Sequence, residues 1–264
     1  MYLLHLLILK KDEMKNTMYL LIFLAGFSNL VVAQTTDRLP CIEKKFSIVA
    51  HIVKDSLGIP GYTKADILKD VDSLNKNFAP ICVSFEVCEF QYIDNFEYLT
   101  VDSAKEWKEM QVLYNLKDRI NIYYVKTIIA PAGTGFSTQS GITDFNNGGI
   151  VIGTKGERVL SHEMGHYFGL YHTFETKFGN ELVNGSNCAT TGDKICDTPA
   201  DPNGTIDGSC NFTSMQQDAN GKYYSPMVNN IMSYYPDICA CKPGFTHDQY
   251  KKMANIYLGK IGMW

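Results

Sequence analysis

The sequence lacks internal repeats and low-complexity stretches, and it has no excess of positive charge. Its 24 Lys and Arg residues are outnumbered by 28 Asp and Glu residues, which gives a formal net charge of -4. A nucleic-acid-binding protein needs a basic face to neutralise phosphates, so this balance argues against nucleic acid as a partner. Hydrophobic residues make up 45% of the chain, which excludes disordered and fibrous proteins. With 264 residues, the chain can bury a core in one domain or in two small subdomains.

Long apolar runs are also missing, apart from a short one near the start. Residues 18–27 are apolar, follow a short positive region that begins at Met14, and precede small residues at 31–33. This order predicts a secretory signal peptide over residues 1–33, with Met14 as an alternative start, and hence a secreted protein. A retained membrane anchor is the weaker alternative, because a membrane-spanning helix needs roughly 20 apolar residues.

No C-x-x-C pair occurs among the eight cysteines, which disfavours a zinc ion held by cysteines. All eight follow the predicted cleavage point, and an even number in an exported chain predicts disulfides. The connectivity stays open. If Cys82 and Cys88 share one strand, they lie about 20 Å apart, far beyond the roughly 7 Å that a disulfide tolerates between Cα atoms. Each therefore needs another partner, and the same is expected of Cys239 and Cys241.

The first half of the chain alternates strand and helix patterns. Thr63 and Asp66 form a capping-box pattern before an apolar stripe, which predicts a helix that ends at Ala79-Pro80. A short helix from Ser103 and a longer one over about residues 157–168 are also expected. Short β-branched or apolar runs predict strands at residues 46–53, 81–90, 120–125 and 149–153. This alternation favours an α/β sheet with parallel pairing.

The second half has a different character. Residues 175–245 are rich in glycine and hold five cysteines but show little periodicity. We expect a loop-rich region that disulfides hold together. Thr246 and Gln249 then form a capping box, which predicts a last helix that runs to about residue 258.

The most informative segment is residues 162–172, with the sequence HEMGHYFGLYH. His162 and His166 are four residues apart, so on a helix both imidazoles project from one face and can bind one ion. Gly169 can take the left-handed conformation that ends a helix. The chain can then turn back to bring His172 to the same ion. Three protein ligands leave a fourth position for water, which is typical of a catalytic zinc site.

Glu163 directly follows the first of these histidines and would lie beside the bound water. We expect zinc to lower the pKa of that water and to polarise the scissile carbonyl. Glu163 would take the water's proton and pass it to the leaving amine. The alternative is a set of unrelated surface or core histidines. Because three of the six histidines fall in this eleven-residue segment, chance is a poor explanation.

The same segment, together with a downstream N-I-M-S-Y at residues 230–234, has the pattern of the metzincin zinc peptidases, in which a Met-turn follows the histidine motif. Within the metzincins the chain resembles the pappalysin family. The resemblance rests on HTF after the motif, GDKICDTP at 192–199, and Cys239 with F-T-x-x-Q at 245–249. The resemblance is close over about residues 148–250. Before residue 148, only the order of helices and strands matches the family. Ser233, where many pappalysins have aspartate, and His247-Asp248, in place of Pro-Gly, depart from the pattern.

The resemblance implies roles for two residues of the Met-turn. Met232 would form an apolar floor below the zinc ligands, although a methionine alone is more often core filler. Tyr234 would bind the zinc or the oxyanion. Asp237 would lie under the S1′ pocket, where a carboxylate favours substrates with Arg or Lys after the cleaved bond. A solvent-facing turn position for Asp237 is equally compatible with the sequence.

The resemblance also implies a calcium site in the loop after the third histidine. Asp193 and Thr198, with a backbone carbonyl between them, match the ligand positions, and carboxylate and carbonyl oxygens suit a hard cation. A solvated turn is the alternative.

The implied fold is α/β (α+β), with a twisted mixed five-stranded sheet, a backing helix and the active-site helix in an upper subdomain of about residues 41–172. An irregular, disulfide-linked lower subdomain covers about residues 173–264. A protein substrate would lie extended between them and pair with an edge strand near residues 133–139. We expect a monomer with no membrane partner after signal cleavage.

Two other classes of protein remain open at this point. A zinc-holding binding protein that no longer cleaves is disfavoured by the intact Glu163. A metal-dependent hydrolase of non-peptide substrates is disfavoured by the Met-turn and by the glycines near the expected edge strand.

Overall fold

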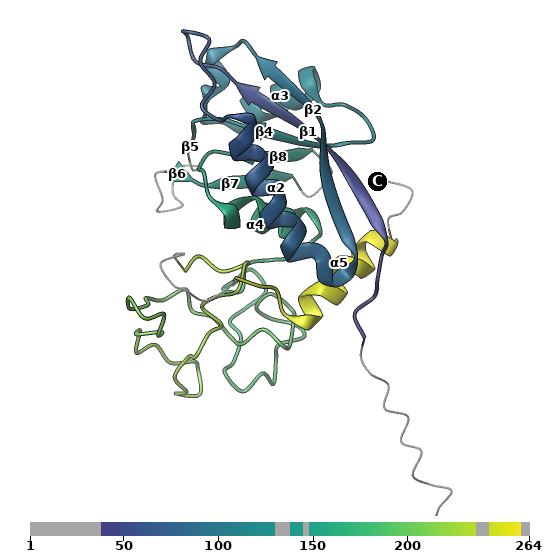
Figure 1. The fold of residues 1–264 in the computed structure, drawn as a ribbon. Coiled ribbons are helices and arrows are strands. Elements are labelled where there is room, and N and C mark those ends of the chain that lie inside the picture. Colours follow the sequence, from purple (N-terminus) through teal and green to yellow (C-terminus); the bar gives the residue numbers. More distant parts are fainter. Residues whose placement is uncertain (1–37, 130–137, 145–147, 236–242, 260–264) are drawn as a thin grey trace, which may run out of the picture. The chain divides into compact units, whose positions relative to one another are not determined.

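The computed structural model describes residues 38–129, 138–144, 148–235 and 243–259 (Figure 1). The contacts divide the chain into residues 1–38 and residues 39–264, and the helices and strands of the described residues belong to the second unit. The predicted signal peptide, Asp237, Cys239 and Cys241 lie outside the described residues.

A five-stranded sheet with the order β2-β1-β4-β8-β7 forms the centre of the fold. Neighbouring strands are parallel except for the edge strand β7, which runs antiparallel to β8. The predicted mixed five-stranded sheet is therefore confirmed. The strands are β1 (Lys44–Val53), β2 (Val83–Ile93), β4 (Ile120–Tyr124), β7 (Gly141–Asp144) and β8 (Gly149–Ile152).

A second, three-stranded sheet was not predicted. It has the order β3-β5-β6, with β3 at Thr100–Val101, β5 at Thr127–Ile129 and β6 at Thr138–Gln139. The edge strand that we expected near residues 133–139 lies mostly outside the described residues. Among those described, β7 forms one edge of the main sheet a few residues further along the chain, and β2 forms the other.

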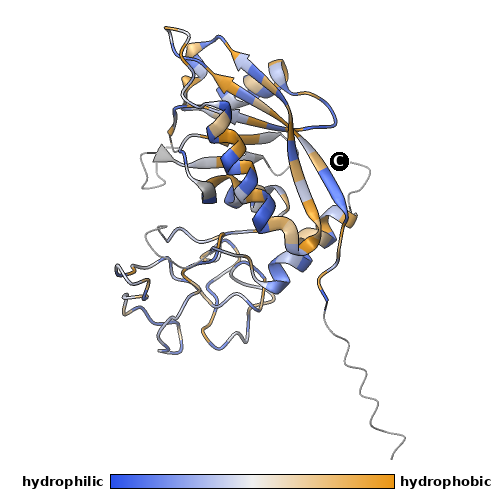
Figure 2. Cartoon of the chain, in the orientation of Figure 1, coloured by the Kyte–Doolittle hydropathy of each residue, from blue (hydrophilic) through white to orange (hydrophobic). Residues whose placement is uncertain are grey.

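Helices cover both faces of the main sheet. On one face, α2 (Lys64–Phe78) packs against α4 (Glu157–Tyr167) over a core that both share with the strands (Figure 1). On the other face, Met110 of α3 (Ala104–Tyr114) packs against Tyr123 and Val151 of the sheet. Figure 2 shows hydrophobic residues concentrated in the strands and along parts of α2.

The helices begin where their local signals predict. Thr63 caps α2 in a reciprocal capping box with Asp66, and a 3₁₀ turn (Ala79–Ile81) follows the helix at Pro80. The hydroxyl of Ser103 accepts a hydrogen bond from the backbone of Glu106 at the start of α3. A second short 3₁₀ helix, Phe96–Leu99, precedes β3.

The loop-rich second half is confirmed. Between α4 and α5 (His247–Gly259) the described residues contain only isolated β-bridges. The predicted capping box is present, because Gln249 accepts a hydrogen bond from the backbone of Thr246 at 2.8 Å and Thr246 accepts one in return at 3.3 Å. Met253 and Tyr257 join α5 to the main core.

Disulfides link Cys41 to Cys82 and Cys188 to Cys196, and Cys210 is also disulfide-bonded. The expectation that every cysteine is paired is wrong at Cys88, which is an exposed free thiol. Its side chain projects from β2 and donates a hydrogen bond to the carbonyl of Ile48 on the neighbouring strand, at 3.2 Å. No helix within the described ranges is long and apolar enough to cross a membrane.

Candidate metal centre

The three predicted histidines meet at one point. His162 and His166 lie on α4 and His172 lies beyond its end. Nε2 of His172 is 3.0 Å from Nε2 of His166 and 3.2 Å from Nε2 of His162. Tetrahedral zinc–nitrogen bonds of about 2.0–2.1 Å separate two ligand nitrogens by about 3.3 Å. The cluster therefore has the spacing that one zinc ion requires.

A glycine turn returns the chain to the helix, as the sequence predicts. Gly169 has a φ of 81°, a left-handed conformation that residues with a side chain rarely adopt. Its backbone N–H donates to the carbonyl of His166 at 2.8 Å, and that of Leu170 donates to the carbonyl of Gly165 at 3.0 Å. A Cβ atom at position 169 would also lie 2.2 Å from Ile256. These contacts fix the direction in which the chain leaves α4 towards His172.

Backbone carbonyls orient the two helical histidines. Nδ1 of His162 donates to the carbonyl of Ile231 at 2.7 Å, and Nδ1 of His166 donates to the carbonyl of Leu170 at 2.8 Å. In these neutral tautomers each Nε2 presents a lone pair to the shared space. Bare lone pairs this close repel one another, and a cation between them removes the repulsion.

Burial keeps the histidines in the form that binds metals. Desolvation lowers the pKa of His162 and His166 below the usual 6.5 and lowers the pKa of His172 to about 3. A neutral imidazole is the metal-binding form. The donor set and its protonation therefore both fit zinc.

Glu163 is buried beside the cluster. Its Oε2 accepts a hydrogen bond of 2.7 Å from the hydroxyl of Thr143 on the edge strand β7. Burial raises the pKa of Glu163 to about 7, and the Thr143 hydrogen bond opposes that rise. The same strand packs tightly on the glutamate, since a Cβ atom at Gly141 would lie 2.6 Å from its Cγ. The sequence does not single out Thr143, because it lies 20 residues before Glu163 in a polar segment without a motif.

Met232 lies under α4. Its side chain is fully buried, and a Cβ atom at Gly165 would come within 2.5 Å of its sulfur. Only a glycine therefore allows the helix to approach the methionine this closely. The backbone N–H of Met232 donates to the side chain of Asn230 at 2.8 Å, which fixes the turn.

Arg158 joins the first turn of α4 to the Met-turn, a contact that the sequence did not reveal. Its guanidinium donates to the hydroxyl of Ser233 at 2.8 Å, to the carbonyl of Tyr235 at 3.0 Å and to the carbonyl of Asn230. Ser233, the position that departs from the family pattern, thus still has a partner on the active-site helix.

Tyr234 faces the histidines. Its ring centroid is 4.6 Å from that of His172 and 5.6 Å from that of His162, and 47% of the residue is exposed. Burial, and then the charge of Glu163, raises the pKa of its phenol to about 12. The phenol therefore stays protonated and can donate a hydrogen bond.

The structure also brings Asp193 and Thr198 together. The Thr198 hydroxyl donates to Oδ2 of Asp193 at 2.9 Å, and the backbone of Ile195 donates to Oδ1 at 2.9 Å. Burial raises the pKa of Asp193 to about 7. Burial and the charge of Asp193 raise the pKa of Glu181 to about 7 as well. Two buried carboxylates repel each other here, and Glu181 lines a cavity of about 320 Å³.

The helix-borne histidine pair, the buried glutamate and the returning third histidine define the class as a zinc-dependent peptidase. The family model described as "Pregnancy-associated plasma protein-A" matches residues 118–257, more than half of the chain. The chain belongs to this family, the pappalysins, and is a zinc metallopeptidase.

Curated relatives come from fungi. An extracellular metalloprotease of Colletotrichum graminicola is 26% identical over 227 residues, which cover 78% of this chain and 74% of that protein. An extracellular metalloprotease of Neurospora crassa is 24% identical over 226 residues, which cover 80% of this chain and 74% of that protein. Among solved structures, archaemetzincin from Methanopyrus kandleri matches with a TM-score of 0.43 and 11% identity over 81% of this chain and 96% of that chain. A TM-score this low supports no argument about fold or function.

Proposed function

We propose that the chain is a secreted endopeptidase in which His162, His166 and His172 hold the zinc ion and Glu163 is the general base. The observation that carries the proposal is the convergence of three Nε2 atoms, with 3.0 Å and 3.2 Å between neighbours, beside a buried carboxylate. A structural zinc site would use a fourth protein ligand, and within the described part of the chain no fourth His, Cys, Asp or Glu joins the cluster.

Zinc, when bound, supplies a Lewis acid that polarises the scissile carbonyl. Glu163 takes a proton from the attacking water and delivers it to the amide nitrogen as that nitrogen leaves. A base of this kind works best when its pKa lies near the operating pH. Burial raises the pKa of Glu163 to about 7. Thr143 holds the carboxylate in one orientation through its 2.7 Å hydrogen bond.

Tyr234 stabilises the negative charge that develops on the carbonyl oxygen. A phenol with a pKa of about 12 donates a hydrogen bond throughout the neutral pH range, and a preorganised donor of this kind lowers the barrier. Met232 supports the ligands from below without taking part in the chemistry.

The substrate is a protein or peptide that binds in an extended form. The edge strand β7 carries the residue that holds Glu163, so a peptide paired with this edge would bring its backbone to the general base. The preference for Arg or Lys after the cleaved bond depends on Asp237 and remains a prediction, which peptide-library profiling with mass spectrometry tests directly.

Secretion is supported by three independent features. The relatives are named extracellular metalloproteases, four of the described cysteines form two disulfides, and residues 1–33 have the pattern of a signal peptide. The mature catalytic domain would then be residues 34–264, with subdomains of about 41–172 and 173–264, acting as a monomer.

Calcium binding at Asp193 and Thr198 is supported by the two buried carboxylates. A divalent cation would neutralise the repulsion between Asp193 and Glu181, and the adjoining cavity gives it access. Adding calcium to chelated protein should therefore raise its thermal unfolding temperature, and an unchanged temperature would count against the site.

The decisive experiment replaces the general base. The Glu163→Gln variant should retain one zinc ion per chain but lose casein cleavage by about a hundredfold or more, the usual contribution of a general base. Chelation should abolish cleavage by the unmodified protein. A Glu163→Gln variant that keeps its zinc and cleaves casein at the original rate would overturn the assignment.

A further inference from the structure

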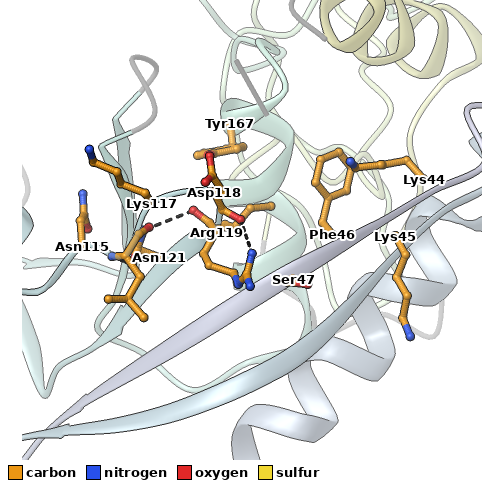
Figure 3. Close-up of a pocket in the computed structure, with 12 residues that line it drawn as sticks. Lys44, Lys45, Phe46, Ser47, Asn115, Lys117, Asp118, Arg119, Asn121 and Tyr167 are labelled. Carbon is orange, nitrogen blue, oxygen red and sulfur yellow. Dashed lines mark hydrogen bonds between the residues drawn. The ribbon is translucent and has the colours of Figure 1, made fainter. Parts of the chain in front are cut away.

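A basic cavity of about 490 Å³ lies at the amino-terminal ends of β1 and β4. Its lining includes none of the three zinc histidines. Figure 3 shows Lys117 and Arg119 from the loop before β4 and Lys44 from β1 around it. Tyr167, the residue after His166, borders the cavity from the end of α4.

The charges of this cavity are unbalanced. Lys44, Lys117 and Arg119 have no ion-pair partner among the described residues, and Asp118 is the only acid that lines the cavity. Lys45 also lines it but forms an ion pair with Glu86. The chain as a whole carries a net charge of -4, so the local charge of this cluster is opposite in sign to the net charge. Three like charges around one cavity with a single lining acid repel one another, and an anionic ligand would reduce that repulsion.

The loop that carries two of these cations is held in a fixed shape. The side chain of Asn121 accepts from the backbone N–H of Leu116 at 2.9 Å and donates to its carbonyl at 2.9 Å. It also donates to the carbonyl of Arg119 at 3.2 Å. Asn115, at the other end of the loop, accepts a hydrogen bond of 2.7 Å from the hydroxyl of Tyr123. Lys117 and Arg119 are therefore presented on a preorganised loop, which reduces the entropy lost on binding.

The cavity combines this basic rim with an aromatic base. Phe46 and Tyr167 line it, and Nζ of Lys44 lies 5.5 Å from the centre of the Phe46 ring. Its volume fits a few side chains, and the aromatic rings favour organic carboxylates over fully hydrated inorganic ions. Polypeptides are the molecules on which a metallopeptidase acts.

We propose that this basic cavity is an exosite that binds a carboxylate-rich stretch of the protein substrate. The proposal rests on the peptidase function, because the exosite tethers a substrate that the zinc site then cleaves. Lys44, Lys117 and Arg119 bind the carboxylates, and the aromatic base packs against the side-chain methylenes.

Binding is tested without cleavage in the zinc-loaded Glu163→Gln variant. The probes are fluorescein-labelled peptides of six glutamates and of six glutamines, measured by fluorescence anisotropy. We expect the glutamate peptide to bind and its affinity to fall with salt. Combining Lys44→Ala, Lys117→Ala and Arg119→Ala should weaken its binding roughly tenfold, because three exposed ion pairs, each of modest strength, are lost.

Two controls separate local contacts from overall charge. Lys45→Ala removes a neighbouring cation that is already paired with Glu86, and it should change the affinity less than twofold. The combination of Lys64→Ala, Lys105→Ala and Lys126→Ala removes three exposed cations elsewhere, and it should leave most of the binding intact. Circular dichroism checks that each variant is folded, and the single substitutions at Lys44, Lys117 and Arg119 replace the triple variant if it is not.

Kinetics of the active protein provide the second readout. A cleavable peptide joined by a flexible linker to six glutamates should have a lower KM than its six-glutamine counterpart. The exosite triple variant should abolish that difference and leave kcat unchanged.

Three results would overturn the proposal. They are equal binding of the two probe peptides, a triple variant that binds the glutamate peptide as tightly as the parent, and a sulfated oligosaccharide that binds the site when the glutamate peptide does not. If the Glu163→Gln protein binds the glutamate peptide but its parent shows no peptidase activity, the cavity is a carboxylate-binding site and not an exosite, and the proposed function is rejected.

Discussion

At the scale of single residues, the three histidines of the metal centre are oriented by different contacts. His162 and His166 each donate a hydrogen bond to a backbone carbonyl. His172 has no such acceptor for its Nδ1 among the described residues. Instead the ring of Phe174 stacks on it, with centroids 4.7 Å apart and an angle of 6° between the planes. Because His172 follows a turn and not a helix, ring contacts restrain its imidazole: this stacking on one side and the ring of Tyr234, at 4.6 Å, as a second contact.

Removing the stacked ring should weaken zinc binding. We expect Phe174→Leu to lower zinc affinity roughly tenfold, the lower end of the usual effect of residues that orient metal ligands. Phe174→Tyr keeps the ring and should bind zinc as the parent does. Competition with a chromophoric chelator measures both. Equal zinc affinity in the leucine variant would show that the turn at Gly169 alone positions His172.

A second residue-scale prediction concerns His51, which is fully buried in β1. Its ring stacks on Tyr123 at 4.4 Å, its Nε2 is 3.0 Å from Oδ1 of Asn121, and its Nδ1 has no hydrogen-bond partner within the described residues. Burial lowers the pKa of His51 below 6.5, although the hydrogen bond to Asn121 and the charge of Glu89 oppose the effect. The native state therefore keeps His51 neutral while the unfolded chain protonates it as the pH falls through 6.5.

The unfolded state binds more protons at His51 below that pH, so this residue contributes a fall in the free energy of unfolding as the pH is lowered from 7 to 5. The raised pKa values of Glu163, Glu181 and Asp193 act in the opposite direction in the parent and the variant alike. His51→Gln should remove its own contribution and so lower the slope of the free energy of unfolding against pH, even if the variant is less stable at pH 7. Urea unfolding at several pH values measures the slope, and His247→Gln, at a partly exposed position, is the control. The proposed zinc ligands are common to all three proteins, so their contribution cancels in the comparison. An identical slope in the parent and His51→Gln would refute the assignment.

At the scale of elements, α4 and the Met-turn form one unit although 75 residues separate Arg158 from Ser233. The guanidinium of Arg158 donates hydrogen bonds to backbone carbonyls of the Met-turn, which has no regular backbone hydrogen bonding of its own. The turn in turn supplies Met232 under the helix and Tyr234 beside the histidines. The position of Tyr234 therefore depends on a contact made at the far end of α4.

Breaking that contact should cost both stability and activity. We expect Arg158→Ala to lower the free energy of unfolding by about 1–3 kcal/mol, the usual cost of leaving partly buried carbonyl groups without partners. It should also lower kcat while zinc content stays at one ion per chain, since Tyr234 would no longer be held. Arg158→Lys keeps the positive charge but lacks the several donors of the guanidinium, so its stability and kcat should lie between those of Arg158→Ala and the parent. Urea unfolding and peptide hydrolysis measure the two effects, and an Arg158→Ala variant with unchanged kcat would argue against the coupling to Tyr234.

Most of the regular elements could be predicted because their signals are local. The capping box at Thr63 and the proline at position 80 determine where α2 begins and ends. β2 begins at Val83, two residues later than expected, because a 3₁₀ turn and a left-handed Cys82 come first. It extends to Ile93, three residues further than expected, because it pairs with β1 as far as Val53. The small second sheet could not be predicted, since strands of two or three residues exist only through their neighbours.

The same division holds within the site. The spacing of His162 and His166 and the glycine at position 169 are local features, so the sequence predicts how they converge. Thr143 and Arg158 reach the site through contacts over 20 and about 75 residues. A single sequence contains no pattern for such tertiary contacts.

At the scale of the whole molecule, the Met-turn connects the irregular second half to the ordered first half. The carbonyl of Asn230 accepts from Arg158 of α4. The side chain of Asn230 accepts from the backbone of Met232 and donates to Gln249 at 3.0 Å, at the start of α5. The carbonyl of Met232 accepts in turn from the backbone of Thr173 at 3.2 Å. The Met-turn therefore lies between the third histidine and the last helix. A region with so little regular structure also needs covalent restraint, and disulfides supply it.

The two described disulfides should contribute unequally to stability. Cys41–Cys82 closes a loop with a sequence separation of 41 residues, and Cys188–Cys196 one with a separation of 8. The chain-entropy model gives about 4 kcal/mol for the longer loop and about 2.5 kcal/mol for the shorter one. Replacing both cysteines of each pair by serine and measuring urea unfolding under oxidising conditions tests this order.

The effect on calcium binding should follow the opposite order to the effect on stability. The Cys41–Cys82 disulfide joins the chain just before β1 to the 3₁₀ turn after α2, a region held by the main core in any case. Cys188–Cys196 encloses Asp193, so its loss frees the loop proposed to bind calcium. The variant that lacks Cys188–Cys196 should therefore lose the rise in unfolding temperature on adding calcium, while the variant that lacks Cys41–Cys82 should keep it despite a larger drop in stability. If both variants respond to calcium as the parent does, the cation binds elsewhere, and Asp193 is only a buried acid that Thr198 and Ile195 hold in place.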